Sequence, residues 1–222
     1  MIKSKSNRRV QINASNPPDY DDEVSGEEYT GMRLKQSDSN VSEDQEPFMG
    51  VKVRRKASLH REIKGDYIGV PSNAYLMKLL QKQGDSQVLF ADKVMKFTSS
   101  GKMKRRILLI TDFAIYLIDP LSDTLKRRIA LPAVERMLLS ELSDNFFAVI
   151  IPTEYDLLMA STRKTEIVTV LADGIKSASD YDLEVLFSNS FEYHASAELI
   201  KEVQFEEAEG GVKTSFLRKQ SQ

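Results

Sequence analysis

The sequence predicts an α+β fold in which β-structure dominates. After a helical pattern that begins near residue 72, short runs rich in β-branched and large apolar residues follow one another, separated by turn signals such as Ser99-Ser100-Gly101. Strands spaced in this way are typical of an antiparallel meander or small barrel, and not of a parallel sheet whose strands alternate with helices. The predicted strands are 87–97, 104–111, 113–118, 124–131, 146–151 and 155–160.

The composition excludes several functional classes. The chain has 222 residues, a net charge of −2 and no cysteine, which excludes disulfides, thiol catalysis and cysteine-based zinc sites. His60 and His194 are isolated, so no metal site and no cofactor are expected. No nucleophile–base pair or Gly-rich phosphate loop is present, so we do not expect an enzyme. The acidic balance also makes nucleic-acid binding an unfavoured interpretation.

Residues 1–60 are expected to form a disordered acidic and polar arm that ends in a basic linker. Between Asp19 and Glu46 acidic residues dominate, and few large apolar side chains are available to offset the entropy of ordering. No run approaches the ~20 apolar residues of a membrane span, and the N-terminus lacks a signal-peptide core. We therefore expect a cytoplasmic protein that meets a membrane, if at all, peripherally and at its cytoplasmic face.

Two short motifs lie in this arm. Pro17, Pro18 and Tyr20 belong to a PPDY sequence, which is either a ligand for a WW-domain protein or a plain proline-containing linker. Ser58 lies in RRKASL, a basophilic kinase pattern, although a solvated basic linker explains the same residues. Phosphorylation there would add roughly −2 charge to a basic cluster and weaken its attraction to anionic lipid.

The folded domain is expected at residues 61–210. Ser72 or Asn73 can cap a helix that runs to about Gln83 and stops at Gly84. A second helix is predicted at Thr165–Ser177, whose apolar stripe would close one opening of the barrel. Extra strands are predicted at 183–187, 190–195 and 200–206, and residues 211–222 are expected to be a flexible basic tail.

The strongest candidate site is the hairpin between the first two predicted strands. Lys96 lies near the end of the first strand, and Lys104 and Arg106 begin the second. Residues two apart on a strand face the same side, so Lys104 and Arg106 should project together, and Lys96 can point into the same space. Such a cluster suits the phosphates of an inositol head group. The candidate supporting cations are Lys93, Lys102, Arg105, Lys126 and Arg128, with Lys126 and Arg128 expected on one strand face.

Several ordered stretches resemble the tail homology domain of class I myosins, a lipid-binding module. They include LLQKQGDSQVLFADKVMKF, GKMKRRILLITDFAIYLIDP, KTEIVTVLADGIK and LEVLFSNSFEYH. The resemblance implies a pleckstrin-homology-like antiparallel barrel with a preceding helix, a closing helix and extra C-terminal strands. It also implies binding to phosphoinositides and other anionic phospholipids, and the family's phosphoinositide pattern matches Lys96, Lys104 and Arg106.

The chain departs from class I myosins in lacking a motor. It has no GxxxxGK[ST] loop and too few residues for a motor domain, so ATPase activity and movement along actin do not transfer. The sequence therefore predicts a peripheral membrane-binding module. The alternative is a protein-interaction adaptor that uses PPDY and the acidic arm and is linked to myosin- or actin-associated proteins.

Overall fold

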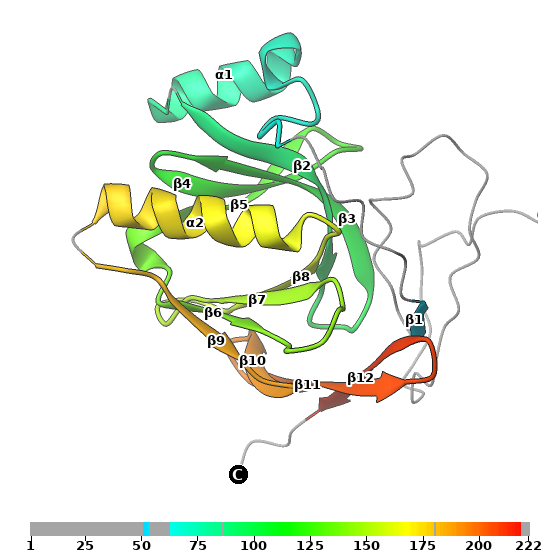
Figure 1. Cartoon of the computed structure of the whole chain (residues 1–222). Helices are drawn as coiled ribbons and strands as arrows, with labels where there is room; N and C mark the ends of the chain where they lie inside the picture. The colour runs from blue at the N-terminus through cyan, green and yellow to red at the C-terminus, as the bar shows by residue number, and fades with distance from the viewer. Residues whose placement is uncertain (1–50, 54–62, 86, 180, 219–222) are drawn as a thin grey trace, which may run out of the picture.

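The computed structural model describes residues 51–53, 63–85, 87–179 and 181–218. It contains two α-helices and two β-sheets, which confirms the predicted α+β class (Figure 1). The PPDY motif and Ser58 lie outside the described residues, as does most of the predicted arm.

The larger sheet has eight strands in the order β5-β4-β3-β2-β8-β7-β6-β9. Every pair is antiparallel except β6 with β9. In the described part of the chain the edge strands β5 and β9 do not pair with each other, so the sheet curves without closing into the complete antiparallel barrel that was expected. Its strands are β2 (Val88–Phe97), β3 (Met103–Thr111), β4 (Ala114–Asp119), β5 (Thr124–Ala130), β6 (Arg136–Leu139), β7 (Phe146–Ile150), β8 (Leu157–Ala160) and β9 (Glu184–Phe187).

The smaller sheet has the order β1-β12-β11-β10. It consists of β1 (Val51–Val53), β10 (Ser190–Ser196), β11 (Leu199–Ala208) and β12 (Gly211–Arg218). Two expectations are wrong here. Residues 211–218 are a strand and not part of a flexible tail, and 51–53 pair with it although they were assigned to the arm. Gly210, with φ of 82°, turns the chain back as a hairpin between β11 and β12.

Both helices follow their sequence signals. The side chain of Asn73 accepts a hydrogen bond from the Leu76 N–H at 3.1 Å and caps α1 (Ala74–Gln83), and Gly84 ends it in the left-handed conformation. α2 (Lys164–Ala178) buries the predicted stripe of Ile167, Leu171 and Ile175. Figure 1 shows α1 above the large sheet, α2 across its concave side and the smaller sheet below.

Three apolar clusters hold these layers together. One fills the concave side of the large sheet beneath α2, and another packs α1 against strands β2 to β4. The third joins the two sheets through aromatic rings. Phe97 of β2 stacks on Phe216 of β12 at 4.7 Å between ring centroids, and Phe146 contacts Phe205 at 5.8 Å. The smaller sheet is thereby fixed beside the β2–β3 hairpin.

Candidate anion-binding site

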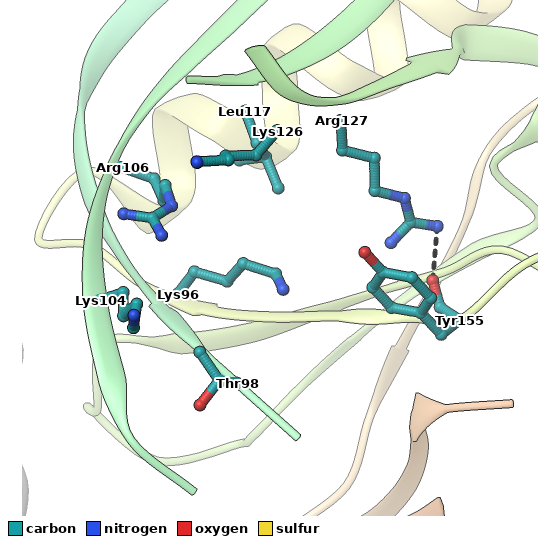
Figure 2. Close-up of a pocket in the computed structure, with 8 residues that line it drawn as sticks. All are labelled: Lys96, Thr98, Lys104, Arg106, Leu117, Lys126, Arg127 and Tyr155. Carbon is teal, nitrogen blue, oxygen red and sulfur yellow. Dashed lines mark hydrogen bonds between the residues drawn. The ribbon is translucent and has the colours of Figure 1, made fainter. Parts of the chain in front are cut away.

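A pocket of about 250 Å³ lies at the hairpin end of the concave face of the large sheet (Figure 2). We call it the cationic pocket, because five of its eight lining side chains are cationic. Figure 2 shows Lys96 extending across the pocket, with Arg106 on one side and Arg127 on the other. The lining residues are Lys96, Thr98, Lys104, Arg106, Leu117, Lys126, Arg127 and Tyr155.

Strand register explains why the three predicted cations meet. Lys96 of β2 lies directly opposite Lys104 of β3, and Arg106 lies opposite Val94. Alternation puts these residues on the face that carries Val94 and Leu108, which are buried in the concave core. The face of the hairpin that is apolar in the core therefore carries three cations near the β2–β3 turn.

A β-bulge adds two further cations from β5. Leu117 of β4 pairs with Arg127, but the next residue, Ile118, pairs with Leu125, so Lys126 is an extra residue on β5. A bulge interrupts the strict alternation of side chains. As a result Lys126 and Arg127 both line the pocket, whereas Arg128 does not. The expectation that Lys126 and Arg128 share one face is wrong for this reason.

Two carboxylates offset part of the positive charge. Asp119 lies 3.3 Å from Arg106 Nη1 and 3.8 Å from Lys126 Nζ. Glu154 lies 2.8 Å from Arg127 Nη2. No carboxylate of the described residues lies within ion-pair distance of Lys96 or Lys104. The pocket thus keeps an excess of positive charge.

Lys96 carries its positive charge in an unfavourable environment. Burial, followed by the nearby charges of Arg127 and Arg106, lowers the pKa of Lys96 to about 8. Its Nζ lies 5.4 Å from the centroid of the Tyr155 ring, a cation–π contact. The ring provides partial compensation, and an anion in the pocket would provide more.

Arg127 is held rigidly, with one donor left over. Its guanidinium lies 3.9 Å from the Tyr155 ring centroid, Nε donates to Glu154 at 2.9 Å, and Nη2 donates to the Tyr155 carbonyl at 2.6 Å. Nη1 is buried and has no hydrogen-bond partner among the described residues. A buried donor without a partner costs free energy. An incoming oxygen atom would satisfy this donor.

The loop that carries Tyr155 is anchored to the smaller sheet. Asp156, which is buried, accepts hydrogen bonds from Ile151 N–H at 2.9 Å and from His194 N–H at 2.7 Å. Its own N–H donates to the His194 carbonyl at 2.8 Å. These bonds fix the aromatic wall of the pocket. The backbone of His194 therefore helps to position this loop. The described residues contain no group of three or more side chains that could hold a metal ion.

The β2–β3 turn is also rigid. The Thr98 hydroxyl donates to the Lys102 carbonyl at 2.9 Å and accepts from the Lys102 N–H at 3.1 Å. Gly101 has φ of 86°, a left-handed conformation that glycine adopts without strain. The cations on both strands are therefore presented from a fixed hairpin.

The other four supporting cations lie elsewhere. Lys93 pairs with Ile107 and Arg105 with Met95, which places both on the opposite face of the hairpin, and Lys102 lies in the turn. Sequence reasoning missed Arg127 and Tyr155 as pocket residues. Arg127 was visible within the basic run 126–128, but the bulge that selects it has no signal in the sequence.

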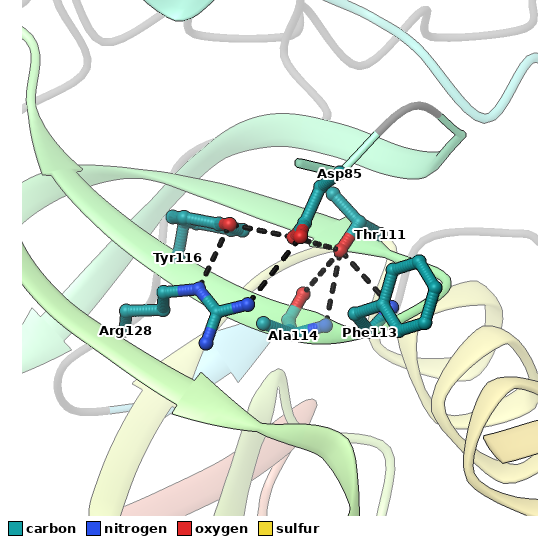
Figure 3. Close-up of polar contacts among 6 residues, drawn as sticks. All are labelled: Asp85, Thr111, Phe113, Ala114, Tyr116 and Arg128. Atoms are coloured by element: carbon teal, nitrogen blue, oxygen red, sulfur yellow. Dashed lines mark hydrogen bonds and ion pairs between the residues drawn. The ribbon is translucent and has the colours of Figure 1, made fainter. Parts of the chain in front are cut away.

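Arg128 belongs to a separate polar network (Figure 3). Asp85, which follows α1, accepts hydrogen bonds from the Thr111 hydroxyl at 2.8 Å and the Tyr116 hydroxyl at 2.5 Å. Arg128 donates to Tyr116 at 2.9 Å and lies 3.4 Å from Asp85. Burial, together with the bond to Asp85, raises the pKa of Tyr116 to about 12. The network ties the end of α1 to β3, β4 and β5.

Comparison with known proteins identifies the family of this chain. The family model described as "Unconventional myosin tail, actin- and lipid-binding" matches residues 54–222. Myosin heavy chain IB of Acanthamoeba castellanii is 34% identical over 155 residues, which cover 66% of this chain and 13% of the relative. Myosin IB heavy chain of Dictyostelium discoideum is 31% identical over 169 residues, 73% of this chain and 15% of the relative.

The chain thus spans only a small part of the length of these relatives. None of the described helices is long and apolar enough to cross a membrane. The family match covers more than half of the chain, including the hairpin, the cationic pocket and strands β10 to β12 of the smaller sheet. The chain therefore belongs to the unconventional myosin tail family.

Proposed function

We propose that this chain binds anionic phospholipids at a membrane surface, with the phosphates of a phosphoinositide head group in the cationic pocket. The family description names lipid binding in general. The pocket supplies the chemistry for a specific head group, because ammonium and guanidinium groups from three strands meet in one small volume. Arginine adds bidentate contacts to phosphate oxygens.

The observation that carries the proposal is a pair of incompletely satisfied cationic groups inside the pocket. Lys96 has its pKa lowered by burial and by two neighbouring cations, and Arg127 Nη1 is a buried donor without a partner among the described residues. Each group costs free energy without a bound anion, and a bound phosphate would offset that cost by pairing with the Lys96 charge and accepting a hydrogen bond from Arg127 Nη1. A site with this character is typical of anion binding rather than of a solvated surface.

Vesicle co-sedimentation tests the proposal. Wild type is expected to bind phosphatidylcholine vesicles that contain 5% phosphatidylinositol bisphosphate, and to bind less as salt increases. Because each cation near the surface contributes ~1 kcal/mol, Lys96→Ala with Arg106→Ala should weaken this binding by roughly tenfold or more.

The matched control is Lys93→Ala with Arg105→Ala. It removes the same charge from the same hairpin, but from the face that does not line the pocket. This control should keep the preference for vesicles with the bisphosphate over vesicles with an equal charge of phosphatidylserine. If both double variants lost that preference equally, the pocket would not be the head-group site.

The family description also names actin, which supports a second candidate function. Co-sedimentation with actin filaments, using the same variants, separates the two. Binding to actin that survives the loss of the pocket cations, together with unchanged vesicle binding, would favour the adaptor interpretation. A pull-down with WW domains would test the PPDY motif in the same way.

A further inference from the structure

The smaller sheet carries a second pair of cations beside the β2–β3 turn. Lys201 of β11 and Arg218 of β12 are direct partners across the two strands. Alternation places them on the same face as Val203 and Phe216, which pack between the two sheets. The apolar layer between the sheets therefore ends in two adjacent cations.

This pair is electrostatically unfavourable. Like charges directly opposite each other destabilise a sheet. Burial, followed by the charge of Arg218, lowers the pKa of Lys201. Among the described residues no carboxylate lies within ion-pair distance of either cation. The nearest acidic residues along these strands are Glu192 and Glu202, which lie opposite each other in the β10–β11 register and on the other face of the sheet.

The turn of the hairpin lies against this pair. A Cβ atom at Gly101 would lie 3.5 Å from Lys201 Nζ, so the turn backbone and the Lys201 ammonium are neighbours. Ser99, Ser100 and Lys102 are exposed around the same turn. The hairpin thus has the cationic pocket on one face and the Lys201–Arg218 pair next to its other face.

We propose that Lys201 and Arg218, beside the β2–β3 turn, form a second site for the phosphate of an anionic phospholipid. The inference rests on the proposed function, because it assumes that the hairpin meets a membrane. Two cations match the single phosphate of a lipid such as phosphatidylserine, whereas the five cations of the pocket match a head group with several phosphates. A phosphate between Lys201 and Arg218 would replace their mutual repulsion with two attractions.

Both sites lie near the turn of one hairpin, so one membrane surface can meet both. Once one head group is bound, the second site meets lipid at a high effective concentration. The pocket would then select the phosphoinositide, and the Lys201–Arg218 pair would add affinity for the surrounding anionic lipid. The overall affinity would depend on both lipids together.

The test uses the full chain and two kinds of vesicle. One contains phosphatidylcholine with 30% phosphatidylserine, and the other contains phosphatidylcholine with 5% phosphatidylinositol bisphosphate. Lys201→Gln with Arg218→Gln should weaken binding to the phosphatidylserine vesicles by roughly tenfold, given ~1 kcal/mol for each cation. The same variant should bind soluble inositol trisphosphate as wild type does in calorimetry, because the pocket is intact.

The control Lys82→Gln with Lys176→Gln removes two exposed charges from the helices, away from the hairpin. It should change binding to phosphatidylserine vesicles by less than about twofold, since only long-range attraction is lost. If this control and the Lys201–Arg218 variant weakened binding equally, the second site would be refuted. Loss of inositol trisphosphate binding in the Lys201–Arg218 variant would also refute it.

The variant Arg218→Glu distinguishes loss of the second lipid site from a folding defect. It removes as much charge as the double Gln variant but converts the repulsive pair into an ion pair, so thermal stability should be equal to or above that of wild type. Vesicle binding should nevertheless fall as in the double variant. Wild-type binding by Arg218→Glu would overturn the second site alone, whereas failure of wild type to bind either vesicle would overturn the proposed function.

Discussion

Raising the pH above about 8 should weaken binding of a phosphoinositide to the cationic pocket, because Lys96 then loses its charge. In the free protein the pKa of Lys96 is lowered to about 8 by burial and by Arg127 and Arg106. A bound phosphate favours the charged form and should return this pKa toward its ordinary value of 10.5. The complex therefore takes up a proton above pH 8, and the apparent affinity should fall by about tenfold between pH 7 and pH 9.

The assay is vesicle binding at constant ionic strength across this range. The second ionisation of a phosphomonoester has a pKa of about 6, so the phosphate is already about nine-tenths doubly ionised at pH 7 and gains little further charge up to pH 9. Lys96→Arg keeps a positive charge at every pH tested and should give a flat profile. A flat profile for wild type would refute the reasoning. A tenfold fall that persists in Lys96→Arg would assign the titration to another group.

Deprotonation of Lys96 should weaken lipid binding as the pH rises, but it should increase the stability of the folded protein without ligand. Between pH 8 and 10.5 the unfolded chain holds the Lys96 proton and the folded chain does not, so the contribution of Lys96 to stability rises with pH in this window. Below pH 8 the charged side chain is a cost that the fold bears without ligand. Bound anion should therefore raise the thermal stability of the protein most clearly at neutral pH.

Two further predictions concern single side chains. Arg127→Lys keeps the charge but loses the bond to the Tyr155 carbonyl and the Nη1 donor, so binding to bisphosphate vesicles should weaken by roughly five- to tenfold. The control Arg136→Lys, on β6 and outside the pocket lining, should not change this binding. Asp85→Ala leaves the Tyr116 and Thr111 hydroxyls and Arg128 without their shared acceptor, which should lower the free energy of unfolding by about 2–4 kcal/mol in urea denaturation. A stability within 0.5 kcal/mol of wild type would show that water replaces Asp85 at little cost.

Much of the fold could be predicted from local patterns. Asn73 and Gly84 mark the ends of α1, and the stripe of Ile167, Leu171 and Ile175 identifies α2. These signals act within one or two turns of chain, so the sequence alone carries them. The strand β12 could not be predicted in the same way. Its apolar residues are few, and it is stabilised by pairing with β11 and by the stack of Phe216 on Phe97.

For the site, the sequence by itself determined that Lys104 and Arg106 share a face, because side chains alternate along a strand, and it indicated Lys96 as their partner. Tertiary structure decided the rest. The bulge between β4 and β5 brings Arg127 into the cationic pocket and leaves Arg128 to bind Asp85. Lys201 meets the hairpin turn only because aromatic packing holds the two sheets together. Register, bulges and sheet contacts depend on residues far apart in the chain, which local periodicity does not encode.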